Sequence, residues 1–408
     1  MAETLTVIGA SVRAAVHSAV RAGFTPIAAD LFADLDLARV TAVDRVHDYP
    51  QGLARVCAGS QPGGWMYTGG LENYPDLIRK LDDRSPATSR LEASPPATAR
   101  PLWGNGADAI ERVRDPALVA QVLRRAGLAC PKLWNAAKAR PGDGAWLRKP
   151  FRSTGGLRIA RCQSEPTADL LNPDWYFQEF IPGLSCAAVY LAAGGEALFL
   201  GVSEQLIGTP WLGSGGFKYS GSIGPLELSA RVYDQLVAVG KALAAGFDLI
   251  GLFGVDAVLA DEIVWPVEVN PRYTASVEVL ERGFGWAAIG AHVETCKTKR
   301  LCPAPGMLGR SSPIRKVCGK AVLFARQPLT IMDEQSRSWL QFADGPQNAR
   351  EGPRYADVSA AGTVVPTDAP IVTLLASGEK VPQVHGKLQA LAAVEESRLY
   401  NSSPPLGR

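Results

Sequence analysis

The sequence is poor in the residues that build thiolate metal sites and nucleophilic triads. Only four of its 408 residues are histidine, and its seven cysteines are irregularly spaced without a C-x-x-C pair. A cysteine–histidine zinc site is therefore not expected, and we interpret the cysteines as reduced thiols. No Ser–His or Cys–His pair of the kind that activates a covalent nucleophile is evident.

Long apolar runs and an excess of one charge are also missing. The N-terminus has Glu3 ahead of its first apolar run and no basic segment before it, so we expect no secretory signal and a cytoplasmic protein. The most apolar stretch, residues 243–260, is interrupted by Asp248 and Asp256, and no membrane segment is expected. A formal net charge of +2 gives no reason to expect a nucleic-acid partner.

The first 30 residues instead indicate an α/β fold. LTVIGA, SVRAAVHSAVRAG and FTPIAAD read as strand, helix and strand, with Val16 on the apolar face of the helix and Gly23 ending it. Such an opening is typical of a parallel sheet. The turn at residues 9–11 lacks the G-x-G-x-x-G spacing, so a nicotinamide dinucleotide site is not expected.

Further along, GGWMYTGG before LENYPDLIRKL predicts a second strand, loop and helix. Glu72 and Asn73 then lie where open sheets hold ligands, although a solvated loop with a helix cap explains them equally well. Residues 82–100, dense in Ser, Pro, Ala and Thr, read as a connector. Asp115 followed by Pro116 predicts the start of a helix.

The strongest signal is GVDAVLADEIVWPVEVNPR, which predicts two strands joined by an acidic turn. Alternation puts Glu268 and Asn270 on one face of their strand, near Asp256 of the preceding strand. Two carboxylates and an amide oxygen are suitable ligands for magnesium. Arg272 shares that face and is a candidate catalytic residue, able to hold a carboxylate, a phosphoryl group or an oxyanion. Surface charges on a sheet edge are the alternative interpretation.

The V-E-V-N-P-R segment after G-V-D resembles the metal-binding end of the ATP-grasp superfamily, which includes biotin carboxylase, carbamoyl phosphate synthetase and many carboxylate–amine ligases. The resemblance implies a multidomain protein of α/β and α+β class. A Rossmann-like pre-ATP-grasp domain would span residues 1–106, an ATP-grasp domain residues 107–306, and a β-rich C-terminal extension residues 307–408. It also implies ATP and one or two magnesium ions, with manganese as a possible substitute.

The same resemblance assigns the nucleotide site. WLRKPFRSTGGLRI would supply a catalytic, phosphate-binding Lys149 and a flexible glycine-rich loop, since a lysine is a compact point charge and small residues let backbone amides approach phosphate. The loop residues are Ser153, Thr154, Gly155 and Gly156. DWYFQEFIPG resembles the hinge that holds adenine. The hinge residues are Gln178, Glu179, Phe180 and Ile181.

Two positions depart from the family pattern. Ser185 stands where many relatives have a ribose-binding glutamate, and an earlier lysine is replaced by Arg114, with Arg112 or Lys132 as alternatives. Another glycine-rich segment, residues 213–221, either lines the acceptor pocket or forms a hairpin with exposed aromatic residues.

The motifs favour one reaction over its relatives. A biotin carboxylase would have Gln and Glu where this chain has Thr274 and Ser276, so bicarbonate chemistry loses its base unless Glu278 substitutes. We therefore expect a magnesium-dependent ligase that activates a small carboxylate as an acyl phosphate for attack by an amine or similar nucleophile. In this it is similar to ATP-grasp carboligases, some of which accompany pterin- or furan-linked one-carbon pathways. A biotin carboxylase-like enzyme and a non-catalytic nucleotide-binding protein are the alternatives. A homodimer is compatible with the family.

Overall fold

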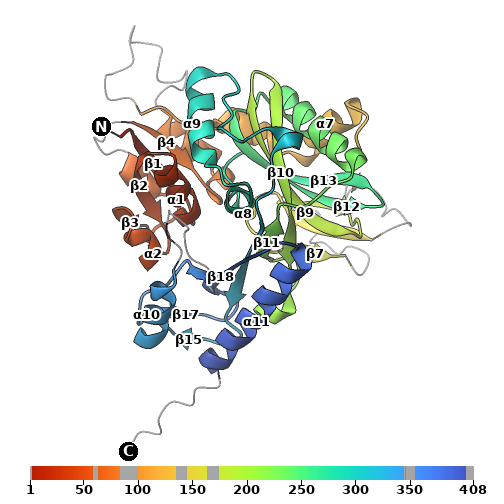
Figure 1. Cartoon of the computed structure of the whole chain (residues 1–408). Coiled ribbons are helices and arrows are strands. Elements are labelled where there is room, and N and C mark those ends of the chain that lie inside the picture. The colour runs from red at the N-terminus through yellow and green to blue at the C-terminus, as the bar shows by residue number, and fades with distance from the viewer. Residues whose placement is uncertain are drawn as a thin grey trace, which may run out of the picture.

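The computed structural model describes residues 2–57, 63–82, 100–134, 145–162, 174–343, 345 and 354–400 (Figure 1). The predicted connector, residues 82–100, falls almost wholly outside them. Among the described residues, no helix combines the length and the apolar character needed to cross a membrane. The side chains of six cysteines are described, and none of these six forms a disulfide.

The N-terminal part is a parallel sheet with helices packed against it, in the strand order β3-β2-β1-β4. Its strands are β1 (Thr4–Ile8), β2 (Thr25–Asp30), β3 (Val43–Arg45) and β4 (Gly64–Tyr67), and its helices are α1 (Arg13–Arg21), α2 (Leu35–Ala38), α3 (Leu53–Cys57) and α4 (Pro75–Leu81). Val12, Val16 and Ala19 are fully buried in the core between this sheet and its neighbours. The predicted strand–helix–strand opening is confirmed.

A small antiparallel sheet follows, with the strand order β5-β8-β6-β7. It consists of β5 (Leu133–Trp134), β6 (Trp146–Pro150), β7 (Ala160–Arg161) and β8 (Trp175–Glu179), preceded by α5 (Ala107–Val113) and α6 (Pro116–Arg125). The carboxylate of Asp115 accepts hydrogen bonds from Ala117 N and Leu118 N, which confirms the predicted start of α6.

The largest element is an eight-stranded sheet in the order β13-β12-β9-β10-β11-β14-β18-β16. Its strands are β9 (Leu184–Ala193), β10 (Glu196–Ile207), β11 (Tyr219–Gly224), β12 (Gly251–Ala260), β13 (Ile263–Asn270), β14 (Val317–Phe324), β16 (Arg354–Ala356) and β18 (Pro370–Gly378). The helices around it are α7 (Ala230–Phe247), α8 (Ala275–Phe284), α9 (Ala288–Thr298), α10 (Asp333–Gln341) and α11 (Val381–Tyr400). The strands β15 (Leu329–Thr330) and β17 (Val364–Val365) pair with each other in a separate two-stranded antiparallel sheet.

Both faces of this sheet are covered. Tyr190 of β9 packs into the core under α7, whereas its neighbours Val189 and Leu191 belong to the core shared with α8, α9 and the N-terminal sheet. This alternation follows from the two-residue period of a strand. In Figure 1 the N-terminal part, in red and orange, lies beside the sheet, and the blue C-terminal strands continue it downward.

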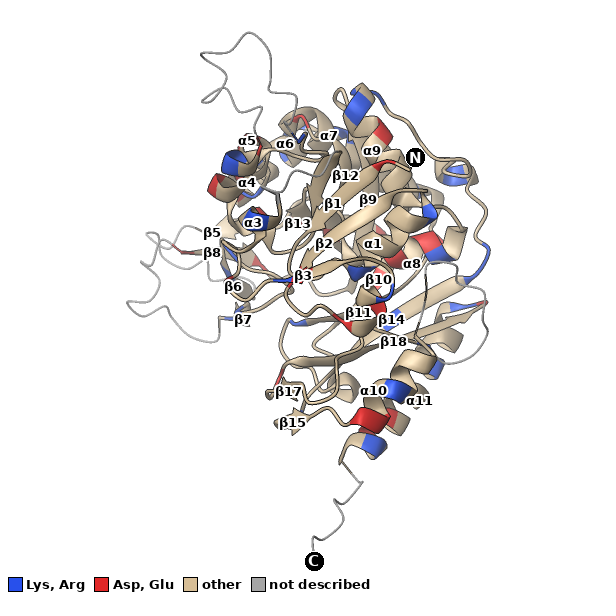
Figure 2. Cartoon of the chain, turned by 90° about the vertical axis from the view of Figure 1, so that its left-hand side faces the viewer, with Lys and Arg blue, Asp and Glu red and all other residues tan. Residues whose placement is uncertain are grey.

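The strands of the large sheet cross the predicted boundary at residue 306. Gly221 of β11 pairs with Ala321 of β14, and Ser222 pairs with Lys320. The mixed multidomain α/β class with a parallel N-terminal sheet is confirmed, but the limits of the three domains stay a prediction. On the elements in view, basic and acidic residues are interspersed (Figure 2).

His292 of α9 joins the sheet to the segment after the N-terminal strands. Its Nδ1 accepts a hydrogen bond from Leu252 N at 2.8 Å, and its Nε2 lies 3.0 Å from Trp103 O, to which it donates. This pattern requires the neutral imidazole. Burial lowers the pKa of His292 to about 4.

We expect His292 to make folding stability depend on pH. Its folded pKa lies below the usual value of about 6.5, so the unfolded state binds more protons and stability falls as pH drops below that value. The loss between about pH 7.5 and about pH 5 is on the order of 2 kcal/mol. Urea unfolding at the two pH values measures it.

The control for this prediction is a second histidine. His47 is exposed, so His47→Gln should keep the pH dependence of the wild type, whereas His292→Gln should lose this part of it. An unchanged dependence in His292→Gln would show that other groups account for the effect.

Candidate active site

A cavity of about 510 Å³ lies where the N-terminal sheet and the two antiparallel sheets meet. It is lined by every predicted nucleotide, metal and catalytic residue except Arg114, which contacts one of them. The predicted residues on its wall are Lys149, Ser153, Thr154, Gly155, Gly156, Gln178, Glu179, Phe180, Ile181, Ser185, Asp256, Glu268, Asn270 and Arg272. The structure thus brings these predicted residues together, although they come from five strands, β6, β8, β9, β12 and β13, and the loops between them.

Two carboxylates face each other at the centre of this wall. Asp256 of β12 is the direct cross-strand partner of Glu268 of β13, and Asn270 follows on the same face, with its Nδ2 3.3 Å from Asp256 Oδ2. Burial, followed by the charge of Glu268, raises the pKa of Asp256 to about 7. Opposed carboxylates repel each other unless a cation lies between them. This donor set fits a divalent cation such as magnesium.

A β-bulge places the lysine beside these carboxylates. The register of β12 and β13 shifts after Asp256, which leaves Val267 without a cross-strand partner. The carbonyl oxygen of Val267 instead accepts hydrogen bonds from Lys149 Nζ at 3.1 Å and Gln178 Nε2 at 3.3 Å. Burial alone would lower the pKa of Lys149, but Tyr176 and Glu268 outweigh it and the pKa is raised. The lysine is thus a buried, charged group.

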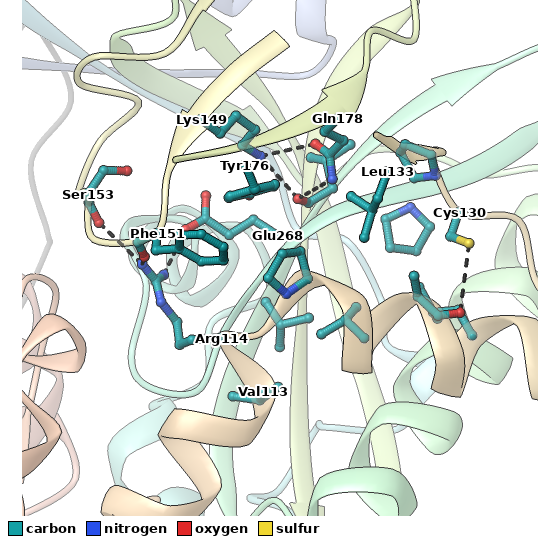
Figure 3. Close-up of a pocket in the computed structure, with 18 of the residues that line it drawn as sticks. Val113, Arg114, Cys130, Leu133, Lys149, Phe151, Ser153, Tyr176, Gln178 and Glu268 are labelled. Atoms are coloured by element: carbon teal, nitrogen blue, oxygen red, sulfur yellow. Dashed lines mark hydrogen bonds and ion pairs between the residues drawn. The ribbon is translucent and has the colours of Figure 1, made fainter. Parts of the chain in front are cut away.

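Arg114 reaches the same carboxylates from the end of α5. Its Nη1 donates to Glu268 Oε1 at 2.8 Å, and its Nη2 donates to Asn73 Oδ1 at 3.2 Å. Asn73 in turn donates to Thr154 Oγ1 at 3.1 Å, so the N-terminal part holds the glycine-rich loop. Figure 3 shows Arg114, Lys149 and Glu268 around a smaller pocket of about 40 Å³ that adjoins the large cavity.

Arg272 is already paired with a carboxylate from the N-terminal part. Its Nη2 lies 2.6 Å from Glu72 Oε1 and 3.1 Å from Asn270 Oδ1, and the side chain of Glu72 is 1% exposed. Burial opposes ionisation of Glu72, but Arg272 and Arg114 lower its pKa. A substrate anion that binds Arg272 would therefore contact a guanidinium group that is already paired with Glu72. The sequence analysis placed Glu72 at the edge of the sheet where ligands bind, but it did not identify Arg272 as its partner.

The glycine-rich loop is fixed by local contacts. Gly155 and Gly156 have φ values of 63° and 75°, a region that glycine adopts readily. A side chain at Gly156 would collide with the carbonyl of Phe217, and Tyr219 N donates to Gly155 O at 2.9 Å. Phe217 and Tyr219 also line the cavity. The segment at residues 213–221 therefore forms part of the cavity wall rather than an exposed hairpin.

Several polar residues of the cavity were missed from the sequence. Gln205 donates to Asp256 Oδ1 at 3.0 Å, and Arg13, Lys320 and Asp357 line the end of the cavity away from the hinge. None belongs to a motif. Arg13 and Asp357 are 344 residues apart in the chain, so no local pattern connects them.

The two antiparallel sheets, with a buried lysine, a glycine-rich loop and opposed carboxylates between them, define an ATP-grasp architecture. Residues 113–276 match a family model described as an ATP-grasp domain. This part of the chain belongs to the ATP-grasp superfamily, as its motifs predict.

Among curated proteins, the chain is 25% identical over 230 residues to the large chain of carbamoyl phosphate synthase from Streptomyces avermitilis, a match that covers 50% of this chain and 21% of that one. The chain thus spans about a fifth of the length of that relative.

Two solved structures show the fold over nearly the whole chain. The biotin carboxylase domain dimer of Hydrogenobacter thermophilus 2-oxoglutarate carboxylase, with MgADP and bicarbonate, has a TM-score of 0.69 at 12% identity and covers 94% of this chain and 88% of its own. The L-amino acid ligase of Bacillus licheniformis has a TM-score of 0.64 at 13% identity and covers 96% of this chain and 97% of its own.

Proposed function

We propose that the protein is a magnesium-dependent ligase that uses ATP to activate a carboxylate as an acyl phosphate and joins it to an amine. The observation that carries the proposal is the opposed pair Asp256 and Glu268 beside the buried cation of Lys149, all on one cavity wall. Carboxylates for a cation, a lysine and a glycine-rich loop are the parts that phosphoryl transfer needs, because positioning and charge stabilisation dominate that reaction.

The reaction has two displacements. A carboxylate oxygen of the substrate attacks the γ-phosphorus of ATP and ADP leaves; the amine then attacks the acyl carbon, phosphate leaves, and the amine loses a proton. Asp256, Glu268 and Asn270 would hold magnesium, whose positive charge would neutralise charge on the phosphates. Lys149 would contact the phosphates, and Arg114 and Arg272 would balance charge on either side of the metal ligands.

The hinge and the loop would bind and enclose the nucleotide. Gln178, Glu179, Phe180 and Ile181 form an apolar and polar wall suited to a nucleobase, and Ser185 lies on the adjoining strand β9. Ser153 to Gly156 would cover the phosphates with their backbone amides and exclude water from the acyl phosphate.

A bicarbonate-activating reaction is less well supported because the remaining candidate base is occupied. Glu278 is held by Arg13 at 2.5 Å and by Lys320 at 3.1 Å, and its side chain is 3% exposed. Burial alone would raise its pKa, but these cations bring the pKa well below the usual value. A carboxylate in that state is a weak proton acceptor. A non-catalytic nucleotide-binding role gives no reason for the opposed carboxylates.

The test is release of ADP and phosphate from the purified protein with magnesium, ATP and a panel of carboxylates and amines, with mass spectrometry of the product. We expect ADP formation that requires one carboxylate and one amine and yields an amide. Biotin with bicarbonate should give no stimulation. Magnesium removal by EDTA is the control. Robust carboxybiotin, or nucleotide binding without turnover across the panel, would point to one of the two alternative functions.

Two of the similar proteins, carbamoyl phosphate synthase and L-amino acid ligase, have names that accord with an acyl-phosphate product and with a ligase, whereas the biotin carboxylase domain is named for the alternative reaction. A homodimer and a cytoplasmic location stay predictions.

A further inference from the structure

Four charged residues from distant parts of the chain meet at the end of the cavity away from the hinge. Arg13 of α1 forms a bidentate ion pair with Glu278 of α8, in which Nη1 donates to Oε1 at 2.5 Å and Nη2 donates to Oε2 at 3.0 Å. The Nε of Arg13 donates to Asp357 Oδ1 at 2.8 Å. Lys320 of β14 donates to Glu278 Oε2 at 3.1 Å. We call these four residues the charged cluster. Figure 2 shows α1, α8 and β14 in one region of the molecule.

The members of the cluster differ in what they present to the cavity. Arg13, Lys320 and Asp357 line the cavity, whereas Glu278 lies behind them. Glu278 pairs with Arg13, Lys320 and Arg282. The side chain of Asp357 is 27% exposed, compared with 8% for Lys320 and 2% for Arg13. Asp357 is therefore the most accessible charge, and Lys320 is a cation beside it.

Asp357 is also held in place. Thr373 Oγ1 donates to its Oδ2 at 2.6 Å, and its backbone N–H donates to Asp36 Oδ2 at 3.0 Å. Burial alone would raise the pKa of Asp357, but Arg13 outweighs it and the pKa is lowered. The carboxylate is thus ionised and fixed, which makes it a preorganised acceptor for a cationic group.

The sheet sets the spacing between the two charges. Thr373 of β18 pairs with Val322 of β14 on one side and with Ala356 of β16 on the other, and Lys320 lies two residues before Val322. Lys320 and Thr373 are therefore diagonal cross-strand neighbours, about 7–8 Å apart between Cα atoms, and Thr373 Oγ1 in turn donates to Asp357 Oδ2. The ammonium group of Lys320 and the fixed carboxylate of Asp357 thus line the same cavity, where one small molecule that carries both charges can meet them.

The cluster is continuous with the candidate catalytic wall. Arg272, Thr274 and Ser276 all line the cavity and lead from Asn270 toward α8, which carries Glu278. A molecule bound at the cluster therefore extends toward Arg272 and the opposed carboxylates.

We propose that the charged cluster binds the α-amino-acid group of one substrate, with Asp357 accepting hydrogen bonds from its ammonium and Lys320 donating to its carboxylate. This group stays unreacted, and the reacting group at the other end of the molecule lies near Arg272. The inference rests on the proposed function for the identity of the reaction, but the binding site itself is testable without turnover.

Binding is measured by calorimetry with a panel of L-α-amino acids, each compared with an analogue that lacks one charge. Glutarate is L-glutamate without its ammonium, and cadaverine is L-lysine without its α-carboxylate. We expect at least one amino acid to bind at least about tenfold more tightly than its analogue, because a hydrogen bond to a charged group contributes about 1.5–3 kcal/mol. Equal affinity for every amino acid and its analogue would overturn the proposal.

Two variants test which residue binds the ammonium group of the amino acid and which binds its carboxylate. Asp357→Asn keeps the shape of the side chain. It should lower the affinity for the preferred amino acid about tenfold and leave the affinity for ATP within about twofold of that of the wild type. Lys320→Met should abolish the preference for molecules that carry the α-carboxylate. Asp333→Asn is the matched control, since the Asp333 side chain is 60% exposed on α10. Unchanged amino-acid affinity in both cluster variants, with normal unfolding in urea, would exclude the site.

The two proposals can fail separately. If an amino acid binds with this charge dependence but no ADP forms with any substrate, the proposed reaction is wrong and the proposed binding site is supported. If ADP forms only with substrates that lack the amino-acid group, and both cluster variants retain that activity, the reaction stands and the site is wrong.

Discussion

Replacing Glu268 with glutamine is expected to lower ATP turnover by about 100-fold or more, since a loss of about 2.7 kcal/mol in transition-state stabilisation has that effect. Glutamine preserves the shape of the side chain and leaves an oxygen that can accept from Arg114. It removes one of the two opposed charges that we propose to hold magnesium against the phosphates. The apparent affinity for magnesium should fall with turnover.

Steady-state ADP release at varied magnesium measures both quantities, and urea unfolding verifies the fold. Glu196→Gln is the matched control, because the side chain of Glu196 is 60% exposed and lies 3.5 Å from Lys241 Nζ at the surface of the sheet. If Glu268→Gln turns over ATP at nearly the rate of the wild type, Glu268 is not a ligand of the catalytic metal ion.

Replacing Lys149 with methionine is expected to weaken ATP binding by about 10- to 100-fold, the range for hydrogen bonds to a charged group. The affinity for adenosine should stay unchanged. The reason is that Lys149 is 5% exposed and reaches the cavity between Gln178 and Val267, whereas the hinge residues contact the base in the proposed arrangement. Methionine keeps most of the buried volume and removes the charge together with the hydrogen bonds that Lys149 Nζ donates to Gln178 Oε1 and Val267 O.

Calorimetry with ATP and with adenosine separates these effects, and Lys241→Met is the control at a 62% exposed lysine. An equal loss for both ligands would indicate a disturbed hinge rather than a lost phosphate contact. Undiminished ATP binding would show that Lys149 does not contact the phosphates.

The parts of the site that lie close together in the sequence were predictable. Asp256, Glu268 and Asn270 occupy two consecutive strands, so alternation alone brings them together, and Asp115 marks the start of α6 by its side-chain chemistry. The bulge at Val267 was not predictable, because the alternating pattern gives no sign of the extra residue. That bulge is nevertheless what turns a carbonyl oxygen toward Lys149.

Contacts between distant segments could not be predicted. The ion pair of Arg272 with Glu72 joins residues 200 apart, and Arg13 meets Glu278 across 265 residues. The sequence marked Arg272 and Glu72 as residues near a ligand but did not pair them, and it gave no sign that Arg13 contacts Glu278. Only the strand order and the packing of α1 against α8 reveal that these charges are buried partners.

The strand order of the large sheet also sets when the site is completed during synthesis. β14 lies next to β11 in the sheet and β18 lies next to β14, but both come about 100 or more residues after β11 in the chain. A ribosome-bound chain that has not yet extruded β14 exposes the backbone donors and acceptors of β11, a surface prone to pairing with other strands. The last strands of the protein therefore protect the newly made chain, in addition to supplying Lys320 to the cavity.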